Sequence, residues 1–299
     1  MNGTGVPLVT PFDSSGRVDR TRLRDLVAWL EERGVDFLVP CGSSGEAPLL
    51  TTDERIRVVE TVAEVTELPV LAGTGREGFE PTLETTERAA AAGADAALVV
   101  TPSYYDSDEE ALAAYYRDLA DDSPIPIYLY SVPKFTDHAL APETVASLAG
   151  HENVAGIKDS SGSLEAIQRL VRLTEDEEFA VLVGSGSIYA AGLTAGADGG
   201  VLALSNVVPG RAGEIYRLHD AGRGNAARAL NADLVELNRA VTSTYGVPGI
   251  KAALATRDQP VGSPRRPLRP LAEAARGALE SVLADALEAT GEADSDRPT

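Results

Sequence analysis

The residue with the clearest chemical potential is a lysine that ends an apolar run. Of the 26 Lys and Arg residues in the chain, only three are lysines: Lys134, Lys158 and Lys251. Lys158 closes the apolar run 154–158, where a charge gains nothing from solvent. At the mouth of a barrel, desolvation disfavours the ammonium form and frees the amine to attack a carbonyl carbon. The position predicts a Schiff-base nucleophile, with a structural ion pair to a nearby carboxylate as the alternative.

A Schiff-base reaction also needs a proton relay and a group that holds the rest of the substrate. Tyr130 ends the apolar run 125–130, and a phenol there suits proton transfer. The turn G-S-S-G-E at 42–46 offers the hydroxyls of Ser43 and Ser44, and its backbone N–H groups, starting at Gly42, suit a carboxylate. The structural alternative for Tyr130 is an aromatic side chain at the barrel rim. The structural alternative for the turn 42–46 is an ordinary tight turn with a helix cap.

Three other patterns are weaker candidates. G-x-G-x-x-G at 73–78 matches the dinucleotide fingerprint, but it follows the third apolar run and lacks an acidic residue at the end of the next strand. The turn around Ser44 is not a nucleophile elbow, because Glu46 stands where that pattern needs glycine. Cys41 has no evident base, and the three histidines lack metal-ligand spacing. We therefore expect neither a cofactor nor a metal.

Alternating apolar runs and amphipathic segments must position these side chains. About eight apolar runs occur, at 6–9, 36–40, 69–72, 96–100, 125–130, 154–158, 180–183 and 200–204. The segments between them have helical periodicity, such as 20–33, which ends at Gly34, and the helix that opens with a capping box at Thr51. Alternating strands and helices predict parallel strands, and eight such units fit a closed (β/α)8 TIM barrel. An open doubly wound sheet is the alternative.

The strand–helix alternation stops before the end of the chain. We expect the barrel to span 1–223, a C-terminal helical extension to span 224–291, and an acidic disordered tail to span 292–299. Catalytic side chains of TIM barrels lie at the C-terminal ends of the strands. Lys158, Tyr130 and the turn 42–46 all occupy such ends.

The net charge and the composition limit which binding partners and which cell compartment we expect. In 299 residues, 46 Asp and Glu against 26 Lys and Arg give a net charge of −20. A field of this sign repels nucleic acid and anionic membranes, and no apolar run is long enough to span a membrane. Acidic composition with arginine favoured over lysine is typical of a halophilic protein in a salty cytoplasm. One cysteine and the lack of signal-peptide features predict a cytoplasmic protein.

With these residues in place, the chain resembles the dihydrodipicolinate synthase / N-acetylneuraminate lyase family of class I pyruvate aldolases. The likeness spans nearly the whole chain, from G-V-P-L-V-T-P-F at 5–12 to Y-G-V-P-G-I-K at 245–251. Its most specific motifs are G-S-S-G-E at 42–46, Y-x-V-P at 130–133 and G-I-K-D at 156–159. The resemblance implies a TIM barrel with C-terminal helices, no cofactor, and self-association, usually as a homotetramer built from two dimers.

The resemblance also implies roles for single residues. Pyruvate would bind as an imine on Lys158, with Tyr130 as the proton-relay tyrosine and Ser43 as the hydroxyl that hydrogen-bonds it. Tyr104 is similar to the tyrosine that reaches into a neighbouring subunit's site and extends the relay.

Three further residues are implied in substrate binding. Ser44 matches the residue that holds the pyruvate carboxylate, in the turn that Gly42 opens. Val201 matches a backbone contact to bound pyruvate.

The chain departs from the synthases where the second substrate binds. Synthases carry an arginine two residues beyond the proline of Y-x-V-P, where this chain has Phe135, which argues against lysine biosynthesis. Archaeal aldolases that accept phosphorylated sugar acids tend to carry arginine after the Tyr-Tyr pair, where this chain has D-S-D at 106–108. The motifs Y-S-V-P, K-D-S and G-V-P-G-I-K are more similar to aldolases of 2-keto-3-deoxy sugar acids and of 4-hydroxy-2-oxoglutarate.

We therefore expect a lyase of carbohydrate metabolism that reversibly cleaves a 2-keto-3-deoxy sugar acid, phosphorylated or not, to pyruvate and an aldehyde. The enzyme alternatives are a 4-hydroxy-2-oxoglutarate aldolase and then 4-hydroxy-tetrahydrodipicolinate (dihydrodipicolinate) synthase. An alternative from a different functional class is a non-catalytic binding barrel, which would keep the fold but catalyse no reaction.

Overall fold

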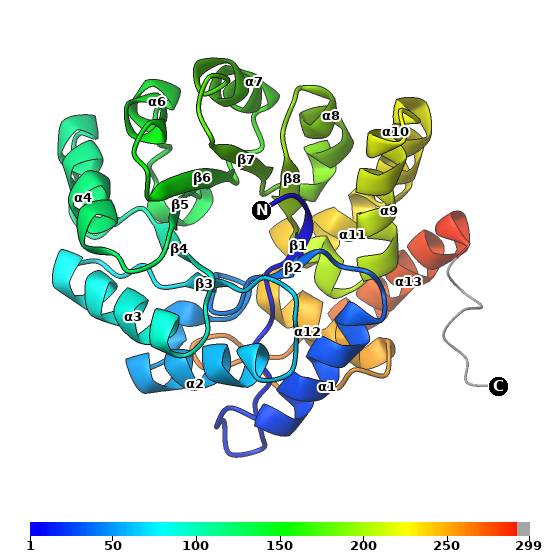
Figure 1. Cartoon of the computed structure of the whole chain (residues 1–299). Coiled ribbons are helices and arrows are strands. Elements are labelled where there is room, and N and C mark those ends of the chain that lie inside the picture. Colours follow the sequence, from blue (N-terminus) through cyan, green and yellow to red (C-terminus); the bar gives the residue numbers. More distant parts are fainter. Residues whose placement is uncertain (292–299) are drawn as a thin grey trace.

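A computed structural model describes residues 1–291, so the tail predicted at 292–299 lies outside the described part. Eight parallel strands form one sheet in the order β2-β1-β8-β7-β6-β5-β4-β3. The strands are β1 (Gly3–Val6), β2 (Phe37–Leu38), β3 (Leu71–Gly73), β4 (Ala96–Val100), β5 (Ile127–Ser131), β6 (Val154–Asp159), β7 (Ala180–Val183) and β8 (Gly199–Val201). A parallel bridge between Leu38 and Val70 brings β2 and β3 together. The predicted (β/α)8 TIM barrel is confirmed (Figure 1).

Helices form an outer layer around the strands (Figure 1). Those of the barrel are α1 (Arg20–Glu31), α2 (Thr52–Ala63), α3 (Phe79–Ala91), α4 (Glu109–Asp122), α5 (Pro133–Thr136), α6 (Pro142–Ala149), α7 (Leu164–Leu173), α8 (Tyr189–Thr194) and α9 (Pro209–Asp220). Short 3-10 turns are η1 (Ala47–Leu49), η2 (Gly186–Ile188) and η3 (Ala203–Asn206). After α9 come α10 (Gly224–Asp233), α11 (Val235–Arg239), the π-helical turn η4 (Ala240–Thr244), α12 (Gly246–Thr256) and α13 (Glu273–Thr290).

Local hydrogen bonds explain where several helices begin. The Thr51 hydroxyl accepts the Glu54 N–H at 3.2 Å, and the Thr51 N–H donates to Glu54 Oε2 at 3.0 Å. This reciprocal pair is the predicted capping box, and it satisfies two N–H groups at the start of α2. Three other helices have a simpler N-cap, in which one side chain accepts one backbone N–H: Asp19 for α1, Asp108 for α4 and Ser163 for α7.

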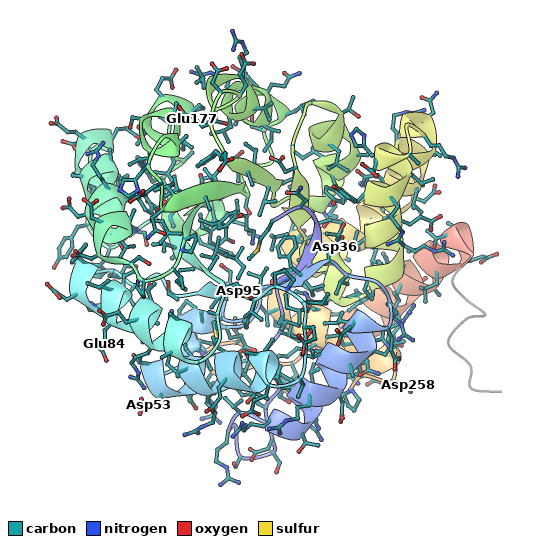
Figure 2. The ribbon with its side chains drawn as sticks, viewed as in Figure 1. Asp36, Asp53, Glu84, Asp95, Glu177 and Asp258 are labelled. Atoms are coloured by element: carbon teal, nitrogen blue, oxygen red, sulfur yellow. The ribbon has the colours of Figure 1, made fainter. Side chains whose placement is uncertain are left out.

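A repeated Gly-x-Asp sequence connects helices to strands at three places. The glycines Gly34, Gly93 and Gly196 have φ of 69°, 96° and 103°, a left-handed conformation that glycine adopts without strain. The aspartates that follow accept a backbone N–H from a neighbouring chain segment at 2.7–2.8 Å: Asp36 from Thr4, Asp95 from Val70 and Asp198 from Val181. In Figure 2, Asp36 and Asp95 lie near the strands, whereas Asp53 and Glu84 lie on outer helices. These aspartates therefore fasten adjacent segments together.

Two apolar cores follow from the alternation of side chains along each strand. One fills the space between strands and helices and includes Ile157, Leu129 and Val183. The other fills the barrel interior and consists of Phe37, Val39, Leu71, Ala96, Leu98, Tyr128, Tyr130, Val132, Leu182 and Val201. Because side chains two apart share a face, Tyr128 and Tyr130 both point inward, Tyr130 nearer the C-terminal end of β5.

Some predicted boundaries differ from the structure. The first strand was predicted at 6–9 but spans Gly3–Val6. It ends immediately before Pro7, which has no N–H for a ladder hydrogen bond. The last strand is shorter than predicted and turns at Leu202 into η3. The first part of the helical extension predicted at 224–291 is divided into α10, α11 and η4. None of these shifts moves a predicted site residue away from the end of its strand.

Candidate active site

Lys158 and Tyr130 face each other inside the barrel near its C-terminal end. The two residues are direct partners in the parallel register of β5 and β6. Lys158 is 4% exposed and Tyr130 is 5% exposed. The Lys158 Nζ lies 4.2 Å from the centroid of the Tyr130 ring. The predicted nucleophile and the predicted relay are therefore neighbours in a site that excludes most water.

No carboxylate neutralises Lys158 in residues 1–291, where no Asp or Glu oxygen lies within 4.0 Å of its Nζ. Asp159 is next in the chain, but alternation along β6 turns it away from the barrel interior. Its carboxylate instead accepts the backbone N–H and the hydroxyl of Ser161. Burial raises the pKa of Asp159 from its ordinary value. The structural ion pair considered for Lys158 is therefore not found in the described residues.

The turn 41–46, between β2 and η1, brings Ser43 to this pair. The Ser43 Oγ and the Tyr130 phenolic oxygen lie 3.4 Å apart. The turn is tight: the Gly45 N–H donates to the Gly42 carbonyl at 3.0 Å, and Cys41 has a left-handed φ of 59°. Such a conformation is uncommon for a residue with a side chain, so the surrounding structure must hold it.

A buried ion pair holds the far end of this turn. Glu46 also has a left-handed φ of 59°, and its Oε1 lies 2.6 Å from the Lys251 Nζ on α12. Both side chains are almost fully buried, at 0% and 2% exposure. The Lys251 Nζ also donates to the Thr10 carbonyl at 2.8 Å, and the Arg265 N–H donates to Glu46 Oε2 at 2.7 Å. Lys251 is thus a structural cation in the middle of α12.

Close backbone packing accounts for two glycines of the G-x-G-x-x-G pattern. A Cβ on Gly73 would lie 2.0 Å from the Cys41 carbonyl oxygen, and one on Gly75 would lie 2.6 Å from the Val100 nitrogen. Both positions therefore admit only glycine. They let the loop after β3 pack against the turn 41–46 and against β4.

A cavity of about 300 Å³ opens above Lys158. Residues from the ends of strands and from the C-terminal helices line it together: Pro7, Ser43, Ser44, Tyr130, Val132, Lys134, Phe135, Lys158, Ser160, Ser161, Gly162, Gly184, Ser185, Val201, Ala203, Asn238, Val241, Thr242, Ser243, Gly246, Val247 and Ile250. Ser44 and Val201 thus line the same cavity as Lys158. Gly42 lines an adjoining cavity of about 610 Å³, which shares Ser43 and Tyr130 with the first.

The chain does not bring Tyr104 to its own site. Tyr104 is 78% exposed, lines neither cavity and packs edge-to-face on Tyr105 at a centroid distance of 5.0 Å. Glu77 fixes the loop by accepting the backbone N–H groups of Ser103 and Tyr104 at 2.8 and 2.9 Å. A role for Tyr104 in catalysis would therefore require a second copy of the chain.

Sequence reasoning did not single out the wall that the C-terminal helices contribute. Asn238, Thr242 and Ser243 lie on α11 and η4 and line the cavity with Lys158. The only available signal was that the resemblance extends to 245–251, which places this region near the site. Lys134 lies in α5 and also lines the cavity.

The described residues contain neither a cluster of metal ligands nor a membrane-spanning helix. In residues 1–291, no group of three or more His, Cys, Asp or Glu side chains gathers as metal ligands. No helix in the same range combines the length and the apolar composition needed to cross a membrane.

A buried lysine at the end of a TIM-barrel strand, beside a tyrosine and a serine-bearing turn, is the arrangement of a class I aldolase. The sequence profile of the "Dihydrodipicolinate synthetase family" matches residues 1–286. The chain belongs to this family of pyruvate-dependent aldolases and lyases.

Three relatives illustrate the likeness. The 4-hydroxy-tetrahydrodipicolinate synthase of Methanothrix thermoacetophila is 37% identical, covering 98% of this chain and 99% of its own length. That of Natronomonas pharaonis is 38% identical, covering 94% and 97%. A crystal structure of dihydrodipicolinate synthase from Acinetobacter baumannii, complexed with pyruvate, has a TM-score of 0.91 at 32% identity, covering 95% and 98%. These names support the synthase alternative more than the sugar-acid lyase that we expected first.

Proposed function

We propose that the protein forms and breaks a carbon–carbon bond between pyruvate and an aldehyde, with Lys158 as the nucleophile. The observation that carries this proposal is the buried Lys158 amine, unpaired with any described carboxylate, 4.2 Å from the Tyr130 ring. A neutral amine there attacks the C2 carbonyl of a 2-oxo acid. The Tyr130 phenol gives its proton to the departing hydroxyl, so that loss of water leaves a protonated imine and a Tyr130 phenolate. The imine then accepts electrons from the bond that breaks.

Tyr130 and Ser43 supply the proton transfers in this proposal. In the cleavage direction, the Tyr130 phenolate takes the proton of the C4 hydroxyl as the C3–C4 bond breaks, and the aldehyde leaves. The electron pair of that bond moves into an enamine of pyruvate on Lys158. Protonation of the enamine carbon and hydrolysis of the imine release pyruvate and restore the amine. Ser43, 3.4 Å from the phenol oxygen, orients the relay.

Two observations favour different second substrates. The names of the relatives favour synthesis of 4-hydroxy-tetrahydrodipicolinate from pyruvate and aspartate 4-semialdehyde, which we place first. Phe135 at the cavity rim and the hydroxyl-rich lining, with Ser160, Ser185 and Ser243, favour cleavage of a 2-keto-3-deoxy sugar acid. The cavity volume of about 300 Å³ suits a small acyclic 2-oxo acid in either case.

One assay panel tests the proposal in both directions. Pyruvate consumption is measured with aspartate 4-semialdehyde, and pyruvate release is measured with 2-keto-3-deoxy sugar acids, their phosphorylated forms and 4-hydroxy-2-oxoglutarate. All assays are run in molar potassium chloride, since a net charge of −20 calls for screening. Turnover with one of these substrates identifies the reaction. No turnover in any assay would overturn the proposal and leave a non-catalytic barrel.

We also infer that the working enzyme is a homo-oligomer, a tetramer by the family resemblance. The exposed pair Tyr104 and Tyr105 supports this inference, because two large aromatic side chains at 78% and 77% exposure mark an interaction surface. If Tyr104 acts in a neighbour's site, mixing inactive Lys158→Ala subunits with impaired Tyr104→Phe subunits restores part of the activity. Failure to restore activity, or a monomer in sedimentation, would contradict this inference.

The helices of residues 224–291 contribute a wall of the cavity through Asn238 and Thr242. This supports treating them as an extension that completes the site of the barrel 1–223.

A further inference from the structure

Lys134 is a cation without a charged partner at the mouth of the candidate site. Its Nζ donates to the Thr242 carbonyl at 3.0 Å, and no carboxylate oxygen within residues 1–291 lies within 4.0 Å of it. The other two lysines are accounted for, Lys158 by the proposed chemistry and Lys251 by its ion pair with Glu46. Lys134 lines both the cavity that holds Lys158 and the adjoining larger one.

The π-helical turn η4 explains how this cation is held over the cavity. A π-helical turn changes the hydrogen-bond spacing of the helix, and such turns occur often at functional sites. Here the Thr242 carbonyl in η4 accepts from Lys134. The Thr242 hydroxyl donates to the Asn238 carbonyl at 2.6 Å, one turn earlier. Lys134, Thr242 and Asn238 therefore form one continuous wall of the cavity.

The Asn238 side chain ties this wall to η2. The residue is 4% exposed, and its Nδ2 donates to Ser187 Oγ at 2.8 Å. Its Oδ1 is buried within residues 1–291 and packs against Gly186, where a Cβ would lie 2.5 Å from it. This oxygen is therefore closed off from the cavity. Lys134 is the group of this wall that offers a charge to a ligand.

We propose that Lys134 forms a recognition subsite for the far end of the aldehyde substrate. The Lys134 ammonium, held at the cavity mouth by the Thr242 carbonyl, binds an anionic terminal group, carboxylate or phosphate. This inference rests on the proposed function, because it assigns the aldehyde that reacts with pyruvate at Lys158. Phe135 stands where the synthases carry an arginine, so the chain lacks a cation at that position. The adjacent Lys134 would supply the positive charge for an anionic substrate instead.

The test compares anionic and neutral aldehydes of matched length. Pyruvate condensation is measured with succinate semialdehyde against butanal for a carboxylate, and with glyceraldehyde 3-phosphate against glyceraldehyde for a phosphate. In Lys134→Gln, we expect KM for the preferred anionic aldehyde to rise about 10- to 100-fold, the usual effect of losing a charge-assisted hydrogen bond. The matched neutral aldehyde should be affected far less, and Lys134→Arg should recover most of the selectivity. A change in selectivity between succinate semialdehyde and butanal indicates that the subsite binds a carboxylate. A change between glyceraldehyde 3-phosphate and glyceraldehyde indicates that it binds a phosphate.

Arg239→Gln is the matched control. Arg239 is an exposed cation on α11 that lines neither cavity, so its removal should leave the selectivity unchanged.

The outcomes separate this inference from the proposed function. Equal loss with anionic and neutral aldehydes in Lys134→Gln would show that Lys134 only tethers α5 to η4 and would overturn the subsite. Unchanged selectivity would overturn it as well. Borohydride trapping of pyruvate by the same variant reports on Lys158 alone. Trapping without a change in selectivity refutes the subsite and leaves the proposed function standing, whereas no trapping in the wild-type protein refutes the proposed function itself.

Discussion

Lys158 and Tyr130 are direct register partners on adjacent parallel strands, and the amine of one lies 4.2 Å from the ring of the other. Parallel register fixes this relationship through the backbone, so it does not depend on a flexible loop. A site built on strands holds reacting groups with more precision than one built on loops. The predictions below test what this pair and its supports do.

Removing the phenol should slow the reaction and spare the binding of pyruvate. In Tyr130→Phe, we expect kcat to fall about 10²- to 10⁴-fold, because the relay loses its acid–base group. Tyr128→Phe is the matched control: Tyr128 lies on the same face of β5, and its hydroxyl accepts from the N-terminal amine at 2.8 Å. Steady-state kinetics of both variants check this. Equal losses in the two variants would contradict a relay role for Tyr130.

The two serines of the turn should have separable effects. Ser43→Ala should lower kcat by about 3- to 10-fold, because Tyr130 loses a hydrogen-bond partner. Ser44→Ala should raise KM for pyruvate by about 10-fold or more, because a hydrogen bond to a carboxylate is lost. The measurement is kcat and KM with pyruvate varied. An effect of Ser43→Ala on KM alone would exclude its assignment to the relay.

Breaking the buried ion pair should destabilise the fold as well as the site. Lys251→Met leaves the Glu46 carboxylate buried and unpaired, a change that costs about 3–5 kcal/mol of unfolding free energy. Glu46→Gln combined with Lys251→Met removes both charges and should recover part of that loss. Urea unfolding of the single and double variants measures the difference. Wild-type stability in Lys251→Met would show that the pair is not needed.

The contact between Glu54 and Arg265 should make stability depend on pH. Hydrogen bonding from Arg265 lowers the pKa of Glu54 to about 2, with Arg265 Nη1 at 2.7 Å from Glu54 Oε2. An unfolded glutamate titrates at about pH 4.3, so the stabilisation is complete above that pH and is lost as the pH falls toward about 2.

Glu54→Gln is the matched variant for this effect, because glutamine can keep the capping box with Thr51. The difference in unfolding free energy between the wild type and Glu54→Gln should be constant above about pH 5 and shrink at lower pH. Urea unfolding at a series of pH values measures it. A difference that stays constant down to about pH 3 would contradict the shifted titration.

The barrel could be predicted because its determinants are local. Alternating apolar runs and amphipathic segments fix the order of elements, and the capping box at Thr51 and the helix end near Gly34 follow from short-range chemistry. The bounds of β1 were misplaced, because the apolar run 6–9 continues past Pro7 whereas the strand ends at Val6. Lys158 could be identified because lysine is rare in this chain and ends a strand.

The far wall of the site could not be predicted, because it depends on contacts between distant parts of the chain. Asn238 and Thr242 reach the cavity only through the packing of the C-terminal helices on the barrel, and no motif marks them. The ion pair between Glu46 and Lys251 joins residues about 200 positions apart, so their spacing carries no signal. Tyr104 needs a second copy of the chain before its role can be judged.

Borohydride reduction in the presence of pyruvate tests the central claim most directly. The protein is incubated with pyruvate, reduced, digested and analysed by mass spectrometry, with Lys158→Arg as the matched variant. The account predicts a reduced pyruvate adduct on Lys158 in the wild-type protein and none in Lys158→Arg. An adduct on Lys134 or Lys251 instead, or no adduct in the wild-type protein, would contradict it.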